Sequence, residues 1–306
     1  MNTTPTLPIG FYDLIFDKAE KNYQILNILT DNFIKNKFRL IKTPLLEFSQ
    51  NFPNYLRNQQ YFATKDNDSN QILFFRNDIT PQISRLLKTS LKDHPLPLRI
   101  CYSGDILKAQ SSDLFKDRQI TQAGFEIIGS NSTNDIFDVI KLTIDSLKKC
   151  QVKELVVEFT LPKIINEIVK QIQTTSKPQL KQAILTKNIS KIRQLTKNSL
   201  ILEELILKID QNHQNITKLL KEFQFDGKTK EDIKQSQEII TSIIKQYPKI
   251  NFITNIFSNS DLDYHQKIAF NIFQGTTFQV AKGGCYKIND KIDAIGASIY
   301  ASNLLK

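Results

Sequence analysis

Apolar side chains recur at regular intervals along the chain, and their spacing predicts an alternation of helices and strands. Ala19, Tyr23, Leu26, Leu29 and Phe33 fall at helical spacing, which predicts an amphipathic helix from about residue 17 to residue 36. The same criteria predict helices over residues 80–91 and 136–147, strands over residues 39–43, 72–75, 98–103, 118–129 and 155–159, and a polar connection over residues 104–117.

The middle of the chain has a different pattern from its two ends. Between about residues 162 and 247 there is one glycine, Gly227, and the apolar spacing is helical, as at Leu202, Leu205 and Ile209. Strand patterns return at residues 250–253, 268–273 and 278–281, after which the Gly283-Gly284 pair predicts a turn. We therefore expect an α+β protein with a core domain of residues 1–160 and 248–306 and a helical insert of residues 161–247.

One predicted strand, residues 118–129, places polar side chains on a face that also carries isoleucines. Alternation puts Gln122, Gly124 and Glu126 on one side together with Ile120 and Ile128. Gln122 and Glu126 would stand about 13 Å apart, with no side chain at the glycine between them. This arrangement suits a pocket for a small polar ligand. The alternative is a strand face exposed to solvent. The two isoleucines on the same face disfavour it, because they indicate partial burial. A half-buried Glu without a partner would be costly, so Glu126 is expected to have one.

Composition narrows the possible functions. The 306 residues are 40% hydrophobic and carry a net charge of +10, which raises nucleic-acid binding as a possibility. Only seven of the 41 cations are arginines, and the lysines are spread along the chain, so we interpret the charge as a solvated surface and do not expect a nucleic acid as partner. The absence of a signal sequence and of a long apolar run predicts a cytoplasmic protein without membrane association.

Several catalytic signatures are missing from the sequence. It has no phosphate-binding glycine loop, no G-x-S-x-G and no H-E-x-x-H. The three cysteines show no Cys-x-x-Cys spacing, and His94, His213 and His265 lie far apart along the chain. Neither a metal site nor a cofactor is expected, and a hydrolase is disfavoured.

An ordered series of segments resembles the catalytic core of class II aminoacyl-tRNA synthetases, and the histidyl branch in particular. Residues 7–13 (LPIGFYD) resemble the opening motif of that branch, and residues 43–47 (TPLLE) resemble motif 1, whose proline lies at the dimer interface. Residues 75–85 (FRNDITPQISR) resemble the segment that holds the amino acid, and residues 98–105 with 118–129 resemble motif 2. The resemblance implies a mixed, mainly antiparallel sheet flanked by helices.

The resemblance also implies a set of histidine-binding residues. Residues matching Asp78, Thr80 and Gln122 receive the α-amino group in the histidyl branch, and the residue matching Glu126 binds the imidazole. Oxygen acceptors of this kind suit an ammonium group and an imidazole N–H. The set is completed by a second imidazole contact at Tyr264 and His265, and by Lys108 at the motif 2 position where an arginine is expected.

The chain departs from a working synthetase at the positions that bind ATP. Lys108 replaces the motif 2 arginine, and Ser302 or Asn303 stands at the motif 3 arginine. Ser260 replaces an arginine of the histidyl branch, and residues 283–287 read GGCYK in place of GGRYD. Amino-acid activation needs cations at the phosphates, so these losses predict a chain with no catalytic residues.

Regulatory paralogues of the histidyl branch have lost the same chemistry. If the chain is one of them, the resemblance implies a homodimer that assembles with the short-form catalytic subunit of ATP phosphoribosyltransferase, with L-histidine as effector. Two alternatives remain open at this point. One is a truncated synthetase-like enzyme that still activates an amino acid with ATP, and the other is a basic RNA-binding module.

Overall fold

The computed structural model describes residues 6–57, 60–111, 116–197, 200–207, 214–257, 265–275 and 278–305. Within these ranges the largest sheet has eight strands in the order β1-β5-β6-β11-β10-β9-β7-β8. The strands are β1 (Arg39–Ile41), β5 (Leu98–Leu107), β6 (Gln119–Ile128), β7 (Leu155–Thr160), β8 (Asn251–Thr254), β9 (His265–Gln274), β10 (Phe278–Ile288) and β11 (Ile292–Tyr300).

The sheet is mixed and mainly antiparallel. Strand β1 runs parallel to β5 and β7 runs parallel to β8, while the neighbours from β5 through β6, β11, β10 and β9 to β7 are antiparallel. The predicted α+β class is therefore confirmed. Strands from both ends of the chain meet in the middle of the sheet, where β6 pairs with β11.

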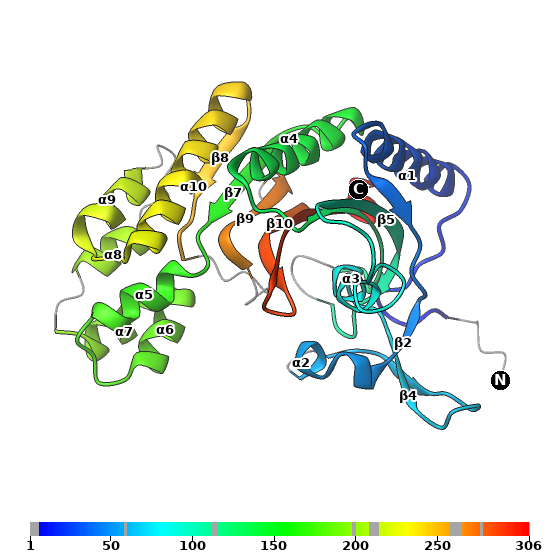
Figure 1. Cartoon of the computed structure of the whole chain (residues 1–306), viewed down its shortest axis with the longest axis horizontal. Helices are drawn as coiled ribbons and strands as arrows, with labels where there is room; N and C mark the ends of the chain where they lie inside the picture. The colour runs from blue at the N-terminus through cyan, green and yellow to red at the C-terminus, as the bar shows by residue number, and fades with distance from the viewer. Residues whose placement is uncertain are drawn as a thin grey trace.

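Helices cover both faces of the central strands (Figure 1). Helices α1 (Asp17–Lys35) and α4 (Thr133–Lys149) lie on the outer, convex face, and α3 (Thr80–Leu86) lies within the curve of the sheet. Strand β6 serves both layers because its side chains alternate. Phe125 packs against Phe33 of α1, with 4.7 Å between ring centroids, whereas Ile120 and Ile128 share a buried cluster with Ile83 of α3.

A small three-stranded sheet leads into α3. It has the order β2-β4-β3, formed by β2 (Leu46–Phe48), β3 (Ala63–Lys65) and β4 (Ile72–Phe75), with η1 (Ser49–Asn51) and α2 (Pro53–Leu56) alongside. Arg76 ties it to the main sheet, because its Nε donates to the Asp105 carbonyl at 2.6 Å and its Nη1 donates to the Thr43 carbonyl at 3.0 Å. The residues between β4 and α3 are thereby held over the sheet.

Between β7 and β8 the described chain is helical, as the sequence predicts. The helices are α5 (Ile164–Gln171), α6 (Lys177–Leu185), α7 (Ile189–Leu195), α8 (Leu200–Leu207), α9 (Gln214–Glu222) and α10 (Gly227–Gln246). They project to one side of the sheet in Figure 1, with α10 beside α4. None of the helices in the described ranges is long and apolar enough to cross a membrane.

Two local expectations are wrong. The first part of the predicted polar connection, residues 104–107, continues β5 and pairs with β6. Gly283 and Gly284 form no turn but lie inside β10, where a Cβ on Gly283 would come within 2.5 Å of the Gly296 carbonyl oxygen. The turn comes later, at Asn289 and Asp290, which have positive φ angles. The chain then continues through β11 to η2 (Ala301–Leu305).

Candidate functional site

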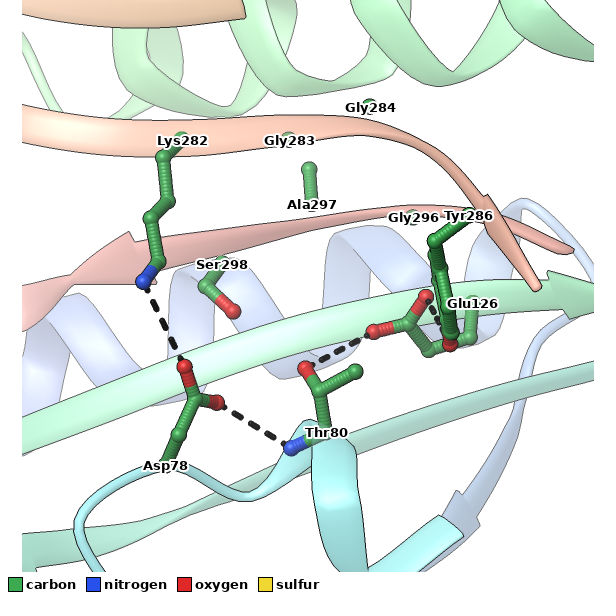
Figure 2. A pocket seen from close by; sticks show the side chains of 10 residues that line it. All are labelled: Asp78, Thr80, Glu126, Lys282, Gly283, Gly284, Tyr286, Gly296, Ala297 and Ser298. Carbon is green, nitrogen blue, oxygen red and sulfur yellow. Dashed lines mark hydrogen bonds and ion pairs between the residues drawn. The ribbon is translucent and has the colours of Figure 1, made fainter. Parts of the chain in front are cut away.

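A polar cavity lies between the start of α3 and the middle of the main sheet (Figure 2). Its volume is about 20 Å³, room for one or two water molecules. It is lined by Asp78, Thr80, Glu126, Lys282, Gly283, Gly284, Tyr286, Gly296, Ala297 and Ser298. Three strands and one helix start thus contribute to it: β6, β10 and β11 from the sheet, and the segment that enters α3.

Glu126 is buried at one end of the cavity and is surrounded by hydroxyl groups. Its Oε1 accepts hydrogen bonds from Thr80 Oγ1 and from the Tyr102 hydroxyl, each at 3.2 Å. Its Oε2 accepts from the Tyr286 hydroxyl at 3.0 Å. Burial raises the pKa of Glu126 to about 8, although these three hydrogen bonds act to lower it. Burial therefore favours the protonated form of this carboxyl group far more than in an exposed glutamate.

Asp78 occupies the other end of the cavity, between β4 and the first turn of α3. Its Oδ1 accepts from the Thr80 backbone N–H at 3.1 Å and from Gln122 Nε2 at 3.2 Å. Its Oδ2 lies 3.4 Å from Nζ of Lys282. Burial alone would raise the pKa of Asp78, but Lys282, Lys108 and the two hydrogen bonds hold it below its usual range. Asp78 is thus a buried, ionised carboxylate.

The polar face of β6 is buried, so the solvent-exposed alternative is ruled out. Gln122 is 0% exposed and Glu126 is 2% exposed. The expected gap above Gly124 does not exist, because Tyr102 of β5 fills it. A Cβ on Gly124 would lie 2.6 Å from the Tyr102 hydroxyl oxygen. This glycine serves to admit the tyrosine, whose hydroxyl lies 3.2 Å from Ser298 Oγ.

The structure brings together four of the predicted ligand residues. Asp78, Thr80 and Glu126 line the cavity, and Gln122 lies beside them, donating also to Ser298 Oγ at 2.6 Å. Lys108 follows the end of β5 and is outside the described lining, although its charge reaches Asp78.

The predicted second imidazole contact is not tested by the structure. Tyr264 lies outside the described residues. His265 opens β9, where its backbone is opposite Tyr286 of β10. Whether either side chain contacts a ligand stays a prediction.

Four residues at the site were missed by the sequence patterns: Tyr102, which contacts Glu126, and the lining residues Lys282, Tyr286 and Ser298. They come from β5, β10 and β11, and the register of the sheet brings them together. Tyr102 is opposite Gly124, and Ser298 is opposite Gly124 on the other side. One available signal was Lys282, a single lysine among the small and apolar residues at 280–285.

Chemically, the cavity offers the ionised carboxylate of Asp78, the carboxyl group of Glu126 with its raised pKa, an ammonium group and several hydroxyls. Oxygen acceptors at both ends suit a small molecule with an ammonium group at one end and an N–H donor at the other. Arginine is not among the described lining residues, and the described His, Cys, Asp and Glu side chains do not gather into a group that could hold a metal ion. The donors and acceptors of the lining are chemically suited to a small polar molecule.

An eight-stranded mixed sheet with this helical cover and a buried polar cavity on its inner face defines a class II synthetase-like core. The chain belongs to the histidyl-tRNA synthetase family, which matches residues 10–304. The ATP phosphoribosyltransferase regulatory subunit of Clostridium kluyveri is 27% identical over 328 residues, covering 98% of this chain and 81% of that protein.

Solved structures agree on the fold. An ATP phosphoribosyltransferase regulatory subunit/histidyl-tRNA synthetase from Bacillus halodurans C superposes with a TM-score of 0.84 at 21% identity, covering 99% of this chain and 83% of that one. A chain of the ATP phosphoribosyl transferase (HisG:HisZ) complex from Thermotoga maritima gives 0.70 at 18% identity, covering 92% and 97%. The predicted likeness to non-catalytic regulatory subunits with a synthetase-like core is confirmed.

Proposed function

We propose that this chain is the regulatory subunit of an ATP phosphoribosyltransferase in the cytoplasm, that it stimulates a short-form catalytic subunit, and that it mediates inhibition by histidine. The names of the curated relatives support the regulatory role. The structure of the complex from Thermotoga maritima, whose chain shares this fold, supports assembly with a catalytic partner. The polar cavity is the observation that supports the histidine part of the proposal.

The cavity matches histidine in the chemistry of its two ends. Asp78 Oδ2 faces the cavity and suits the α-ammonium group, with Thr80 and Gln122 fixing the orientation of the carboxylate. Glu126 lies at the other end and exchanges hydrogen bonds with three hydroxyl groups, so it suits an imidazole N–H. Lys108, Tyr264 and His265 complete the proposed set of histidine-binding residues.

The positions where a synthetase needs arginines support a non-catalytic role. Ser302 Oγ accepts from the backbone N–H of Thr121 at 2.8 Å, and Asn303 Nδ2 donates to the Gln279 carbonyl at 2.7 Å. Cys285 is a buried thiol inside β10. Ser302 and Asn303 thus hold the C-terminal turn against β6 and β10, and none of the three side chains carries the positive charge that phosphate stabilisation requires.

An exposed apolar surface supports self-association. Several large apolar side chains of the N-terminal segment, α1 and β1 are more than 40% exposed, and β1 is an edge strand of the main sheet. Surfaces of this kind mark protein interfaces. We propose that the subunit is a homodimer through this surface, and that the helices between residues 161 and 247 form a separate subdomain beside the core.

The proposal is tested by adding the purified chain to a short-form ATP phosphoribosyltransferase. We expect co-purification, a rate increase, and inhibition of the complex by histidine. Glu126→Ala should keep the stimulation and lose inhibition by histidine, because the imidazole acceptor is gone. Glu238→Ala, on the exposed face of α10, is the matched control and should behave as the native chain.

Two results would contradict the proposal. Absence of stimulation would overturn the regulatory role. Histidine-dependent exchange of pyrophosphate into ATP by the chain alone would establish the enzyme alternative in its place.

A further inference from the structure

A lysine of the chain itself occupies the place where an amino-acid ligand would put its ammonium group. Lys282 extends from β10 across the cavity toward Asp78, as Figure 2 shows. Its Nζ lies 3.4 Å from Asp78 Oδ2. The side chains of Lys282 and Asp78 are only 16% and 6% exposed, so this ion pair is largely withdrawn from solvent.

The two oxygens of Asp78 have different partners, and the cation is paired with only one of them. Oδ1 receives the Thr80 backbone N–H and the Gln122 amide, both from elements that form the fold. Oδ2 is the oxygen that faces the cavity, and it is the one paired with Lys282. A lysine ammonium and an α-ammonium are both primary ammonium groups with three donors, so they make the same demand on this oxygen.

The small volume of the cavity also indicates that Lys282 occupies the position of a ligand group. A cavity of about 20 Å³ holds one or two water molecules, whereas sites that enclose small organic ligands measure hundreds of Å³. Glu126 Oε2 is likewise engaged by the Tyr286 hydroxyl at 3.0 Å. An amino acid that places its ammonium group at Asp78 therefore has to displace the Lys282 ammonium from that position.

We propose that Lys282 is a tethered competitor of the amino-acid ligand, filling the ammonium position at Asp78 and lowering the affinity of the pocket for histidine. The inference rests on the histidine pocket proposed above and adds a residue that sets its affinity. A ligand that displaces Lys282 exchanges one ammonium–carboxylate pair for another, so its own ammonium group contributes little net binding free energy. The chain then responds to histidine only at concentrations high enough to displace the lysine.

The test compares histidine binding by calorimetry to the native chain and to two variants. Lys282→Ala removes both the ammonium and the stem, and Lys282→Met keeps an unbranched stem without the charge. We expect both variants to bind histidine at least about tenfold more tightly than the native chain, since a difference of one ion pair is commonly worth a factor of that size. A thermal shift on histidine addition, larger in both variants, confirms that each is folded.

A ligand that lacks the α-amino group distinguishes two effects of removing Lys282. One is the loss of a competing ammonium group, and the other is the gain of space in the cavity. Imidazole propionic acid should bind the native chain about as well as histidine does, because the ammonium position is already filled. In Lys282→Ala, histidine should bind at least about tenfold more tightly than this analogue. Comparing the two ligands in the two chains forms a double-mutant cycle, which measures the coupling between Lys282 and the amino group of the ligand.

Three outcomes would overturn the inference. Equal histidine affinity in the native chain and both variants would show that Lys282 does not compete with histidine, without contradicting the proposed pocket. Tighter binding in Lys282→Ala but not in Lys282→Met would show that the stem, and not the ammonium, blocks the cavity. Absence of histidine binding in all three chains would refute the pocket itself and this inference with it, whereas stimulation of the catalytic subunit would still be measured separately.

Discussion

Glu126 shows how one buried side chain can make the stability of the whole chain depend on pH. The residue is 2% exposed, and burial raises its pKa to about 8. In the unfolded chain the same group ionises near pH 4.5. Between these two pH values the folded chain holds a proton that the unfolded chain has released. The contribution of Glu126 to the free energy of unfolding therefore falls as pH rises, by up to about 1.4 kcal/mol per pH unit.

Glu126→Gln should remove this pH dependence, because an amide keeps the shape of the protonated acid and does not titrate. The free energy of unfolding of the variant, relative to that of the native chain, should rise from pH 5 to pH 8. Urea unfolding at four pH values in this range measures the difference, in which the contributions of the other groups cancel. Parallel curves for the two chains would show that Glu126 is already ionised in the folded protein.

At the same scale, the sequence predicted part of the site and missed the rest for a physical reason. Strand alternation placed Gln122 and Glu126 correctly on one buried face. It could not show that Tyr102 fills the space above Gly124, because that contact depends on the pairing of β5 with β6. Lys282 was missed in the same way, since its partner Asp78 lies about two hundred residues away along the chain.

At the scale of elements, the pairing of β11 with β6 requires a glycine opposite Glu126. Gly296 is the partner of Glu126 in the register, and a Cβ at this position would lie 1.6 Å from Glu126 Oε2. Gly296→Ala should therefore displace the carboxyl group or part the strands. We expect it to lower the free energy of unfolding by about 1–3 kcal/mol, the usual cost of overpacking a core.

Gly227→Ala is the matched control for that substitution. Gly227 is the first residue of α10, and an added Cβ meets no atom within 4 Å. Its free energy of unfolding should be unchanged or slightly higher, since alanine is the better helix former. Equal effects of the two substitutions in urea unfolding would refute the role given to Gly296.

Elements whose residues show a clear local pattern were predicted well. Features that depend on contacts between distant parts of the chain were not. The helix expected over residues 17–36 is α1, and the strand expected over residues 72–75 is β4. The Gly283-Gly284 pair reads locally as a turn, yet both residues lie inside β10, and the Gly296 carbonyl oxygen and the Phe270 ring approach Gly283 too closely for a side chain. Close approach of backbones leaves the same sequence signature as a turn.

At the scale of the whole molecule, the proposed dimer interface is the apolar surface of the N-terminal region. Phe16, Tyr23 and Ile34 are 80%, 68% and 46% exposed. Phe16 directly precedes α1, whereas Tyr23 and Ile34 lie eleven residues apart within it, so at 100° per residue their side chains point within about 20° of one another on one side of the helix. Leu40, on the edge strand β1, is also largely exposed, at 52%. A second copy of the chain, docked by a two-fold axis, would cover this surface on both subunits.

Tyr23→Lys should weaken this self-association, because it places a charge in the middle of the apolar surface and removes an aromatic side chain of the kind that dominates interfaces. We expect the native chain to sediment as a dimer at micromolar concentration and the dissociation constant of the variant to rise at least about tenfold. Leu200→Lys is the matched control, since Leu200 is 76% exposed on α8, far along the chain from the proposed interface. A native chain that stays monomeric, or a control that dissociates as readily as Tyr23→Lys, would remove this surface as the dimer interface.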